Sequence, residues 1–304
     1  MGNKIIVVGS SNTDMVAKLP RIPSTGETVM GTDFFIFHGG KGANQAVAAA
    51  RAGGSVTFIA CVGDDNFANE SIENYKKDQI DTSCIKIQPK MHSGMALIFL
   101  SEAGENSIAV TPRANNYLKA DDIHKNRNVF ADASVVLLQL EMPMETVEAA
   151  IEVAASKGVP VILNPAPAAM IKDDLYKRIT VLTPNETEAA FLTLRKEFTA
   201  EDFPAMAKDL FDKGVENVII TLGDKGVYLK NNEFDGTISG YKVKPVDPTA
   251  AGDVFNGTLS VALAQGKDLQ EAIDFAQKAA AISVTRLGAQ PSAPNLNEIL
   301  NYEI

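Results

Sequence analysis

The chain has 304 residues, 45% hydrophobic and 22% charged, a composition typical of a globular protein with a sizeable core. Its formal net charge of −10 at pH 7 argues against binding to nucleic acid or to anionic membranes, so local donors must hold any anionic substrate. Cys61 and Cys84 lack the spacing of a zinc site or a disulfide framework, and no apolar run is long enough to span a membrane. We therefore expect a cytoplasmic protein with one α/β domain over residues 1–304.

Polar residues follow the first predicted strand, at its carboxyl end. Lys4–Gly9 is a short apolar run that ends in glycine, which is typical of a buried parallel strand, and the polar segment Ser10–Asp14 follows as a predicted loop. Ligands of open α/β sheets bind at the carboxyl ends of strands, so Asn12 and Asp14 are candidates for binding the hydroxyls of a polyol. An Asx-turn is the competing interpretation, and the local sequence favours it.

A glycine-rich sequence, GGKGANQA, follows two β-segments predicted at Thr28–Met30 and Phe34–Phe37 and opens a helix that ends at Gly53-Gly54. This sequence is not a Walker A phosphate-binding loop, because Lys41 is followed by glycine rather than by Ser or Thr. Lys41 and Asn44 flank the glycines and suggest a backbone that comes close to a small polar ligand. A flexible helix N-terminus is the alternative explanation of the same glycines.

A β-hairpin is predicted further along, after a strand at Val56–Val62 and a helix that ends near Asp78. Gly94–Leu100 and Ser107–Thr111 flank a glycine-containing turn, which is the pattern of a hairpin. Gly94–Leu100 and Phe34–Phe37 are apolar without alternation, so we expect a small sheet that is covered on both faces.

From about residue 121, strands and helices alternate regularly, which predicts a doubly wound, mainly parallel sheet. The predicted strands are Val135–Leu140, Val159–Leu163, Ile179–Leu182, Asn217–Leu222 and Val227–Lys230, and the predicted helices are Glu145–Lys157, Val254–Gln265 and Leu269–Thr285. Polar residues follow several strand ends, among them Glu141, Asn185 with Glu188, and the loop at Gly223. We expect this edge of the sheet to gather the functional site.

The segment Val246–Gly257, VDPTAAGDVFNG, combines a turn, small residues and the start of a helix. Unpaired N–H groups and the dipole at a helix N-terminus favour an anion. Asp253 then stands beside an anion hole, where it can accept a hydroxyl proton while the amides hold a transferring phosphate. The alternative is that Asp253 only caps the helix, and these residues alone favour neither interpretation.

Metal-binding candidates are few. The three histidines lie far apart without ligand spacing, so the sequence predicts no zinc site. Asn185 and Glu188 place two oxygen-bearing side chains on one face of a helix start, which suits a hydrated Mg²⁺. A polar first turn that complements the helix dipole is an equally good interpretation.

Together these motifs resemble those of the ribokinase-like family of carbohydrate kinases. The resemblance covers about residues 3–292 and rests on the ordered sequences SNTD, GGKGANQA, FIACVGDD, QLE, LNPAPA, TPNETE, ITLGDKGV, TAAGDVFNG and VTRLGAQPS. It implies a Rossmann-type three-layer fold with a small β-lid contributed by about residues 12–37 and 92–113. It also implies ATP-dependent, in-line phosphorylation of D-ribose at O5 to give D-ribose 5-phosphate, with Mg²⁺ accompanying ATP and K⁺ as activator.

The same resemblance implies a role for each matching residue. Asp253 would be the base, and the amides of Ala250, Ala251, Gly252 and Asp253 the anion hole for the γ-phosphate. The implied sugar-binding residues are Asn12, Thr13, Asp14, Gly40, Lys41, Gly42, Ala43, Asn44, Glu141 and Asp253. The implied nucleotide-binding residues are Asn185, Thr221, Leu222, Gly223, Asp224, Lys225, Gly226, Gly252, Asp253 and Gln277. Glu188 would hold Mg²⁺ through water, and the implied K⁺ residues, acting largely through backbone carbonyls, are Asp247, Thr249, Ser283, Arg286, Gly288 and Ser292.

Some positions depart from the family pattern. Pro248 stands in the cation loop, where it removes an N–H but no carbonyl, so we expect the ion site to be kept. Gln277 replaces the His or Asn expected near adenine, which leaves the nucleotide preference open. Arg113 replaces a small residue expected near the hinge of the lid.

Two alternatives stay open at this stage. A kinase for deoxyribose, another pentose or a nucleoside would use the same motifs. A non-catalytic sugar-sensing protein of the same fold is disfavoured by the presence of Asn185, Gly252 and Asp253. A dehydrogenase is disfavoured because no GxGxxG sequence follows Val8.

Because the predicted lid is apolar on both faces, we also expect a homodimer that forms through it.

Overall fold

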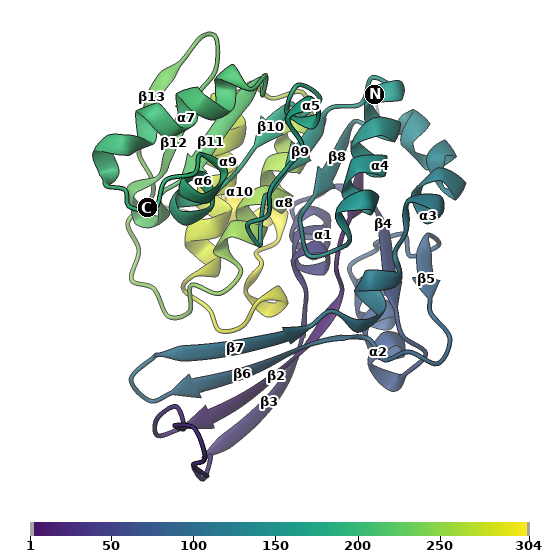
Figure 1. Ribbon diagram of the computed structural model, residues 1–304, viewed down its shortest axis with the longest axis vertical. Helices are drawn as coiled ribbons and strands as arrows, with labels where there is room; N and C mark the ends of the chain where they lie inside the picture. The colour runs from purple at the N-terminus through teal and green to yellow at the C-terminus, as the bar shows by residue number, and fades with distance from the viewer. Residues whose placement is uncertain (1–2, 303–304) are drawn as a thin grey trace.

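The computed structural model describes residues 3–302, and within them the strands form two sheets of unequal size (Figure 1). The large sheet has the order β13-β12-β11-β10-β9-β8-β1-β4-β5, and the small sheet has the order β3-β2-β6-β7. Figure 1 shows the small sheet projecting from the helix-covered large sheet. None of the helices in residues 3–302 combines the length and the apolar character needed to cross a lipid bilayer.

The large sheet is mainly parallel, as the sequence predicts. Its strands are β1 (Lys4–Val8), β4 (Ser55–Val62), β5 (Ile85–Ile87), β8 (Val135–Leu138), β9 (Val161–Leu163), β10 (Val181–Leu182), β11 (Asn217–Thr221), β12 (Val227–Lys230) and β13 (Asp235–Ile238). In the order given above, all neighbouring strands between β11 and β5 pair in parallel. At the other edge, β12 pairs antiparallel with β11, and β13 pairs antiparallel with β12. Parallel neighbours bring the carboxyl ends of β1, β8, β9, β10 and β11 to one edge.

Helices cover both faces of this sheet and explain its continuous apolar strands. One layer consists of α1 (Lys41–Arg51), α2 (Asn66–Lys77), α8 (Ala251–Ala264), α9 (Leu269–Ser283) and α10 (Leu296–Leu300). The other consists of α3 (Ala120–Lys125), α4 (Met144–Ser156), α5 (Asp173–Tyr176), α6 (Glu186–Leu192) and α7 (Phe203–Asp212). Short 3₁₀ helices occur at η1 (Arg113–Tyr117), η2 (Arg127–Asp132), η3 (Ala200–Asp202), η4 (Gly223–Lys225) and η5 (Gln290–Ser292).

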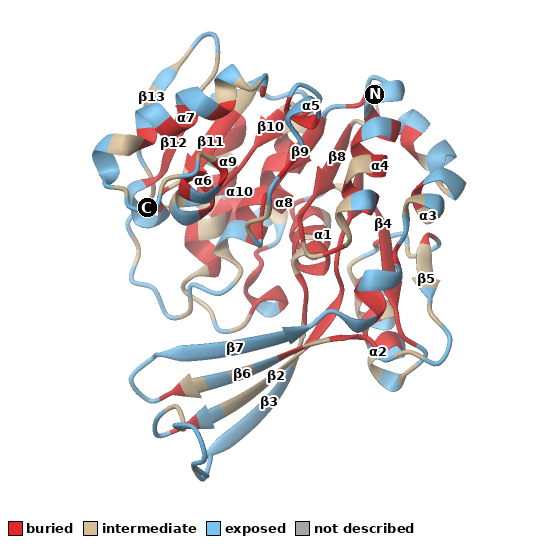
Figure 2. Ribbon diagram, viewed as in Figure 1, coloured by how far each residue is buried: buried red, intermediate tan, exposed pale blue. Residues whose placement is uncertain are grey.

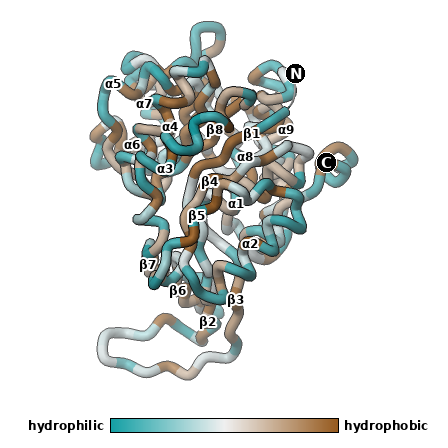
Figure 3. Tube along the Cα trace, turned by 90° about the vertical axis from the view of Figure 1, so that its right-hand side faces the viewer, coloured by the Kyte–Doolittle hydropathy of each residue, from teal (hydrophilic) through white to brown (hydrophobic). Residues whose placement is uncertain are grey.

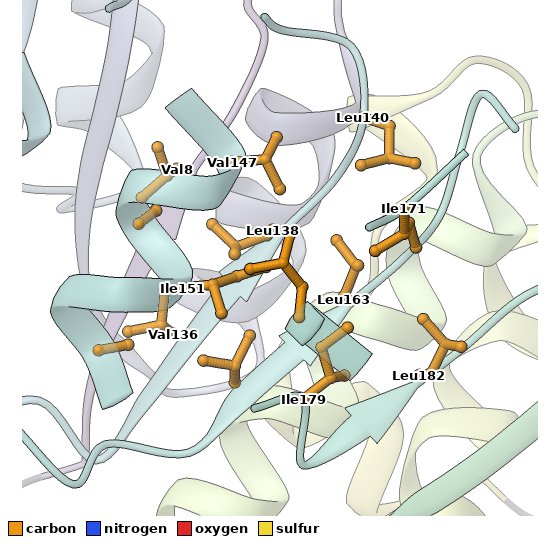
Figure 4. Close-up of a cluster of buried hydrophobic side chains, with 14 of the residues drawn as sticks. Val8, Val136, Leu138, Leu140, Val147, Ile151, Leu163, Ile171, Ile179 and Leu182 are labelled. Atoms are coloured by element: carbon orange, nitrogen blue, oxygen red, sulfur yellow. The ribbon is translucent and has the colours of Figure 1, made fainter. Parts of the chain in front are cut away.

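The core lies on both sides of the large sheet because alternate residues of each strand face opposite helix layers. Ile5 and Val7 of β1 pack with α1, α8 and α9, whereas Ile6 and Val8 pack with α4 and its neighbours. Figure 4 shows the second cluster, with Val8 and Leu138 among its labelled side chains. Figure 3 shows the hydrophobic course of β1 and β4 through the middle of the molecule. Each buried methylene contributes about 0.8 kcal/mol, so these strands anchor the scaffold that holds the site.

The small sheet consists of β2 (Asn12–Leu19), β3 (Asp33–Gly39), β6 (Gly94–Ser101) and β7 (Asn106–Thr111). We call this sheet the lid. The register pairs Asp14 with Phe37 and Ala96, so one face carries Asp14, Val16, Phe35, Phe37, Ile98 and Ile108. The opposite face carries Phe34, Ile36, Leu97 and Phe99.

Both faces of the lid are apolar, as predicted, but a single chain does not cover them. Phe34, Ile36 and Leu97 on the outer face are 59%, 50% and 44% exposed, and Ile108 on the face of Asp14 is 54% exposed. Figure 2 shows the contrast between the exposed and intermediate lid and the buried strands of the large sheet. The expectation of a sheet covered on both faces is therefore wrong for the isolated chain.

The structure also corrects several predicted boundaries. The loop predicted at Ser10–Asp14 is confined to its first two residues, because β2 begins at Asn12 and pairs with both β3 and β6. Thr28–Met30 is not a strand, and β2 is the neighbour of β3 instead. Helix α8 begins at Ala251 rather than at Val254. The strand predicted at Val135–Leu140 ends at Leu138.

Candidate active site

Five charged side chains gather at the carboxyl edge of the large sheet, beside the start of the lid. They are Asp14 on β2, Lys41 at the start of α1, Glu141 after β8, Glu188 on α6 and Asp253 on α8. Each lies close enough to others of the set to shift their pKa values. The sequence motifs that are far apart along the chain therefore meet in one place.

Asp253 does not cap its helix. The N-cap of α8 is Ala250, a left-handed residue with φ of 63°, and Asp253 follows in the first turn. Its carboxylate accepts hydrogen bonds from Asn44 Nδ2 at 3.0 Å and from Gln45 Nε2 at 2.9 Å, both on α1. The capping interpretation of Asp253 is therefore wrong.

The pKa of Asp253 is raised by burial, and this effect is opposed by Lys41 and by the hydrogen bonds from Asn44 and Gln45. A carboxylate in this position can accept a proton from a neighbouring hydroxyl, provided that these donors keep it ionised. The amides of the first turn lie beside it, and a Cβ added to Gly252 would meet no heavy atom within 4 Å. The start of α8 therefore borders open space that an anion can fill.

The glycines around Lys41 are sterically required rather than flexible. Gly40 has φ of 90°, and a Cβ added there would come within 2.7 Å of Asn12 N. A Cβ on Gly42 would lie 2.6 Å from the backbone of Gly9, so α1 packs directly against the end of β1. Gly42 and Ala43 thereby hold the start of α1 in the site, and the alternative of a flexible helix N-terminus is wrong.

Lys41 is the cation nearest the carboxylates. Asp253 raises the pKa of Lys41 more than burial lowers it, and Glu141 acts in the same direction as Asp253. Glu141 Oε2 accepts hydrogen bonds from Ser10 Oγ at 2.5 Å and from Lys41 N at 3.1 Å. Glu141 is therefore fixed against the ends of β1 and α1, with its other oxygen atom available to a ligand.

Asn12 and Asp14 lie in strand β2, so the Asx-turn interpretation is wrong for both. Asn115 Nδ2 of η1 donates to Asn12 Oδ1 at 2.7 Å, and Ser11 N donates to Asn115 Oδ1 at 2.9 Å. Thr13, between them, is buried on the opposite face of the strand. Burial and repulsion from Glu141 and Asp253 raise the pKa of Asp14 to about 7, although Lys41 opposes them.

Asn185 and Glu188 form a capping box at the start of α6. Glu188 N donates to Asn185 Oδ1 at 2.8 Å, and Asn185 N donates to Glu188 Oε2 at 2.9 Å, which confirms the interpretation of a polar first turn. Burial raises the pKa of Glu188, whereas the Asn185 N–H and Lys41 lower it. One oxygen atom of Glu188 is not used by the capping box, and Lys41 and Asp253 lie close enough to affect the pKa of this carboxyl.

Mg²⁺ fits these residues only as a hydrated ion. Among the described residues, no three His, Cys, Asp or Glu side chains converge to hold a metal ion. Mg²⁺ commonly keeps several waters and takes one or two carboxylates together with substrate phosphates. The oxygen atom of Glu188 outside the capping box can be one of these carboxylate contacts, directly or through a water.

A pocket of about 360 Å³ lies between α8, α9 and the end of β11. Its walls include Thr221, Gly223, Asp224, Gly226, Ala251, Gly252, Gln277 and Pro248, whereas Asn185, Leu222 and Lys225 do not line it. Gly226 is required there because a Cβ would come within 2.1 Å of Ile238 O. Gln277 Nε2 donates to Ser239 O at 3.3 Å, and its Oε1 is buried without a hydrogen-bond partner in the described chain.

The residues expected to hold K⁺ lie on two loops that the Asp247 carboxylate joins. Asp247 Oδ1 accepts from Thr249 N, and Oδ2 accepts from Gly288 N, both at 2.9 Å. Burial would raise the pKa of Asp247, but the Thr249 side chain and the N–H groups of Gly288 and Thr249 lower it overall. The side chains of Ser283, Arg286 and Ser292 bind Ala280 O, Glu298 and Ala289 O. The Arg286 side chain is thus occupied by Glu298, and the groups suited to a cation are the backbone carbonyls and the lone pairs of the two serine hydroxyls.

Several buried polar residues around the site were not predicted. They are Ser10, Gln45, Asn115, Asn164, Thr183 and Asn256. Asn164 and Thr183 follow β9 and β10, so the rule that selected Asp14 applies to them as well. Gln45 and Asn256 lie on buried helix faces, where the sequence carries no comparable signal.

Comparison with known proteins places these features in a family. Residues 3–296 match the pfkB family carbohydrate kinases. A ribokinase of Haemophilus influenzae is 43% identical over 303 residues, with 99% of each chain covered. A deoxyribokinase of Salmonella typhi is 37% identical over 299 residues, with 98% of each chain covered. The structure of an Arabidopsis thaliana ribokinase complexed with ribose and ATP matches with a TM-score of 0.91 and 31% identity, covering 99% of this chain and 98% of that one.

Proposed function

Because the chain belongs to the pfkB family of carbohydrate kinases, we propose that it is a ribokinase that transfers the γ-phosphate of ATP to O5 of D-ribose. One observation carries the proposal: the first turn of α8 places the Asp253 carboxylate, held by Asn44 and Gln45, beside the amides that border open space. A base and an anion site that share one helical turn suit in-line phosphoryl transfer to a hydroxyl.

The sugar binds between the edge of the large sheet and the lid. Asn12, Asp14, Lys41, Asn44 and Glu141 present donors and acceptors for its hydroxyls, and Asn44 Oδ1 is buried without a partner in the described chain. Asp253 accepts the proton of the O5 hydroxyl as the bond from O5 to the γ-phosphorus forms and the bond from this phosphorus to ADP breaks. The base needs no strongly raised pKa, because a loose transition state requires little activation of the nucleophile.

The phosphates lie along the pocket that ends at Ala251 and Gly252. The amides of residues 250–253 stabilise the negative charge of the transferring group, as donors at a helix N-terminus do. Mg²⁺ bound with ATP would neutralise part of the charge of the phosphates. Asn185 and Glu188 hold its water ligands, and Gln277 lies on the adenine side of the pocket.

K⁺ activation, the dimer and the location of the protein extend the proposal. The loops at 247–249 and 283–292, which Asp247 connects, would hold K⁺, and the ion would support the geometry of the adjacent start of α8. The protein is a cytoplasmic homodimer of single-domain chains, and the lid, contributed by residues 12–39 and 94–111, both covers the sugar and joins the subunits.

A coupled assay of ADP release with ATP and Mg²⁺ tests the proposal over a panel of sugars and nucleosides. We expect ribose to give the highest kcat/KM, because Asn12 and Asp14 offer acceptors for two ring hydroxyls. Deoxyribose is the sharpest competitor, since a deoxyribokinase is among the relatives. A preference for deoxyribose would reassign the substrate, and a panel in which no sugar accelerates ADP release would leave a sugar-sensing protein.

A further inference from the structure

A closed ring of buried hydrogen bonds connects the Asp253 side chain with the peptide that precedes it. In order, the ring passes through Asp253, Gln45, Asn164, Thr183, Asn256 and Gly252. It draws these residues from α1, from the ends of β9 and β10, and from α8. The chain itself closes the ring, because Gly252 and Asp253 are neighbours.

Gln45 occupies the central position of this ring. Its Nε2 donates to Asp253 Oδ1 at 2.9 Å and to Asn164 Oδ1 at 3.1 Å. Its Oε1 accepts from Gln139 Nε2 at 2.5 Å, so all the hydrogen-bonding groups of this amide except its spare lone pair have partners. Gln45 is 0% exposed, and it therefore lies beyond the reach of a ligand.

The other half of the ring reaches the backbone at the start of α8. Asn164 Nδ2 donates to Thr183 O at 3.1 Å, and Thr183 Oγ1 donates to Asn256 Oδ1 at 2.6 Å. Asn256 Nδ2 then donates to Gly252 O at 2.8 Å. This carbonyl belongs to the same peptide unit as the N–H of Asp253, which contributes to the anion hole of the proposed function. A hydrogen bond to the carbonyl of a peptide polarises its N–H and fixes its direction.

The orientation of each amide in the ring is determined by an acceptor that cannot donate. The Asp253 carboxylate only accepts, so Gln45 must present its NH₂ group to it. Gly252 O also only accepts, so Asn256 must present its NH₂ group there and its oxygen to Thr183. Turning either amide over would oppose two acceptors in a buried place, which costs about 1–3 kcal/mol.

We propose, on the basis of the kinase function given above, that Gln45 is a positioning residue for phosphoryl transfer: it fixes the plane of the Asp253 carboxylate relative to the anion hole. Asn44 also binds this carboxylate, but it belongs to the sugar-binding set and its Oδ1 lacks a partner before the sugar arrives. Its contact with Asp253 can therefore change on binding. The hydrogen bond from Gln45 to Asp253 stays the same, because Gln45 is also bound to Asn164 and Gln139 on the side away from the sugar.

A matched pair of variants separates positioning from a role in stability. Gln45→Met keeps the length of the side chain and removes its bond to Asp253. Gln139→Met makes the same change at a residue that is also 0% exposed and binds Gln45 but not Asp253. Melting temperature, kcat, and KM for ribose and for ATP are measured for both variants and for the unmutated enzyme.

We expect both variants to melt earlier, but only Gln45→Met to lose turnover, on the order of 10- to 100-fold, as displaced catalytic groups do. The KM for ATP should change little. Equal turnover in the two variants would overturn the inference. If the unmutated enzyme phosphorylated no sugar, the proposed function would fail instead, so the two failures are distinguishable.

Gln45→Glu gives a second readout that remains informative if Gln45→Met does not fold. A protonated Glu has the shape of Gln and can donate an O–H to Asp253, whereas an ionised Glu repels it. The other charged groups near the carboxylate are Lys41 on α1, Asp14 on β2, Glu141 after β8 and Glu188 on α6. We expect the kcat of Gln45→Glu to fall as pH rises, relative to the unmutated enzyme. A pH profile of unchanged shape would contradict the positioning role.

Discussion

Asp253 carries its charge in a nearly solvent-free position, where it is 7% exposed. An isolated carboxylate would become protonated there, since desolvation disfavours the charged form. Lys41, Asn44 and Gln45 counteract that tendency from one helix, α1. The residues that favour the ionised form of this carboxylate therefore lie within five positions of one another, inside a single glycine-rich motif.

The first prediction concerns the base itself. Asp253→Asn keeps the shape of the side chain but removes the proton acceptor, so turnover should fall by on the order of 10²- to 10⁴-fold. ATP affinity should change little, because the anion hole consists of backbone amides. Steady-state kinetics and a nucleotide titration measure the two quantities. Near-normal turnover in this variant would remove Asp253 from its proposed role.

The raised pKa of Asp14 predicts that its ionised carboxylate destabilises the folded chain. Its pKa of about 7 lies above the usual value of 3.8, so between these pH values the folded state binds more protons than the unfolded state. Stability therefore falls as pH rises through this window. Asp14→Asn abolishes the effect and should raise the free energy of unfolding at pH 7 to 8 by at most about 4 kcal/mol, at about 1.4 kcal/mol per pKa unit, so the melting temperature should rise with it.

The same substitution should weaken ribose binding, because the carboxylate acceptor is lost. In the unmutated enzyme, the KM for ribose should decrease as pH rises from 6 to 8 and Asp14 ionises. Thermal unfolding and ribose titrations across this range measure both effects. If Asp14→Asn has no higher melting temperature than the unmutated protein at pH 8, then burial and the neighbouring carboxylates do not raise the pKa of Asp14.

Elements fixed by local patterns could be predicted from the sequence. Strand β1 and helix α4 are predicted by apolar runs and helical periodicity, and Asn185 with Glu188 predicts the polar helix start of α6. The turn-forming residues Asn12–Asp14 predict a loop where strand β2 begins. It is a strand because β3 and β6 pair with it from distant parts of the chain. Such pairing leaves no local signal.

The same division applies to the site. Asp14, Lys41, Glu141 and Asp253 were predicted because they follow strand ends or occupy a motif. Gln45 was missed, because its function depends on which polar groups of β8, β9 and α8 meet it in space. Buried partners of this kind need a three-dimensional arrangement before they can be recognised.

The two loops joined by Asp247 give a prediction at the scale of elements. A cation held between their carbonyls would stabilise the start of α8, so K⁺ should raise activity over a background of Na⁺ or choline, mainly through turnover or ribose affinity. Asp247→Asn should reduce this response, because one amide cannot accept from both Thr249 N and Gly288 N in the present geometry. Initial rates in salts of each cation measure the effect. Identical kinetics in rigorously K⁺-free buffer would exclude activation.

At the scale of the whole molecule, the outer face of the lid is an exposed apolar surface that we expect another protein surface to bury. Its outer face exposes Phe34, Ile36, Leu97 and Phe99, and monomeric proteins rarely leave contiguous apolar patches of this kind in water. A second copy of the same surface is the commonest solution in homo-oligomers. The register now assigns the two faces, since Ile98 shares the face of Asp14 and Phe99 lies on the other.

Phe99→Asp and Ile98→Asp form a matched pair of tests. Phe99→Asp should dissociate the dimer, because it places a charge in the proposed interface. Ile98→Asp should raise the KM for ribose and affect association less, because its side chain lies on the sugar face. Light scattering at micromolar concentration and ribose kinetics measure the two effects. A monomeric unmutated protein would exclude the lid as the interface.

Strand β7 has a consequence for handling the protein in concentrated stocks. In the described chain, the other sheet edges β3, β5 and β13 each carry a charged residue, Asp33, Lys86 or Asp235, whereas β7 carries none and all of its 6 residues are exposed. A free edge without charge invites a foreign strand to extend the sheet, which is how many proteins begin to aggregate. Glu105 and Pro112 border this edge and keep it short. Turbidity on storage should therefore begin at β7, and Asn106→Lys, on the face of the lid opposite to Phe99, would be the first change to make in preparing a longer-lived sample.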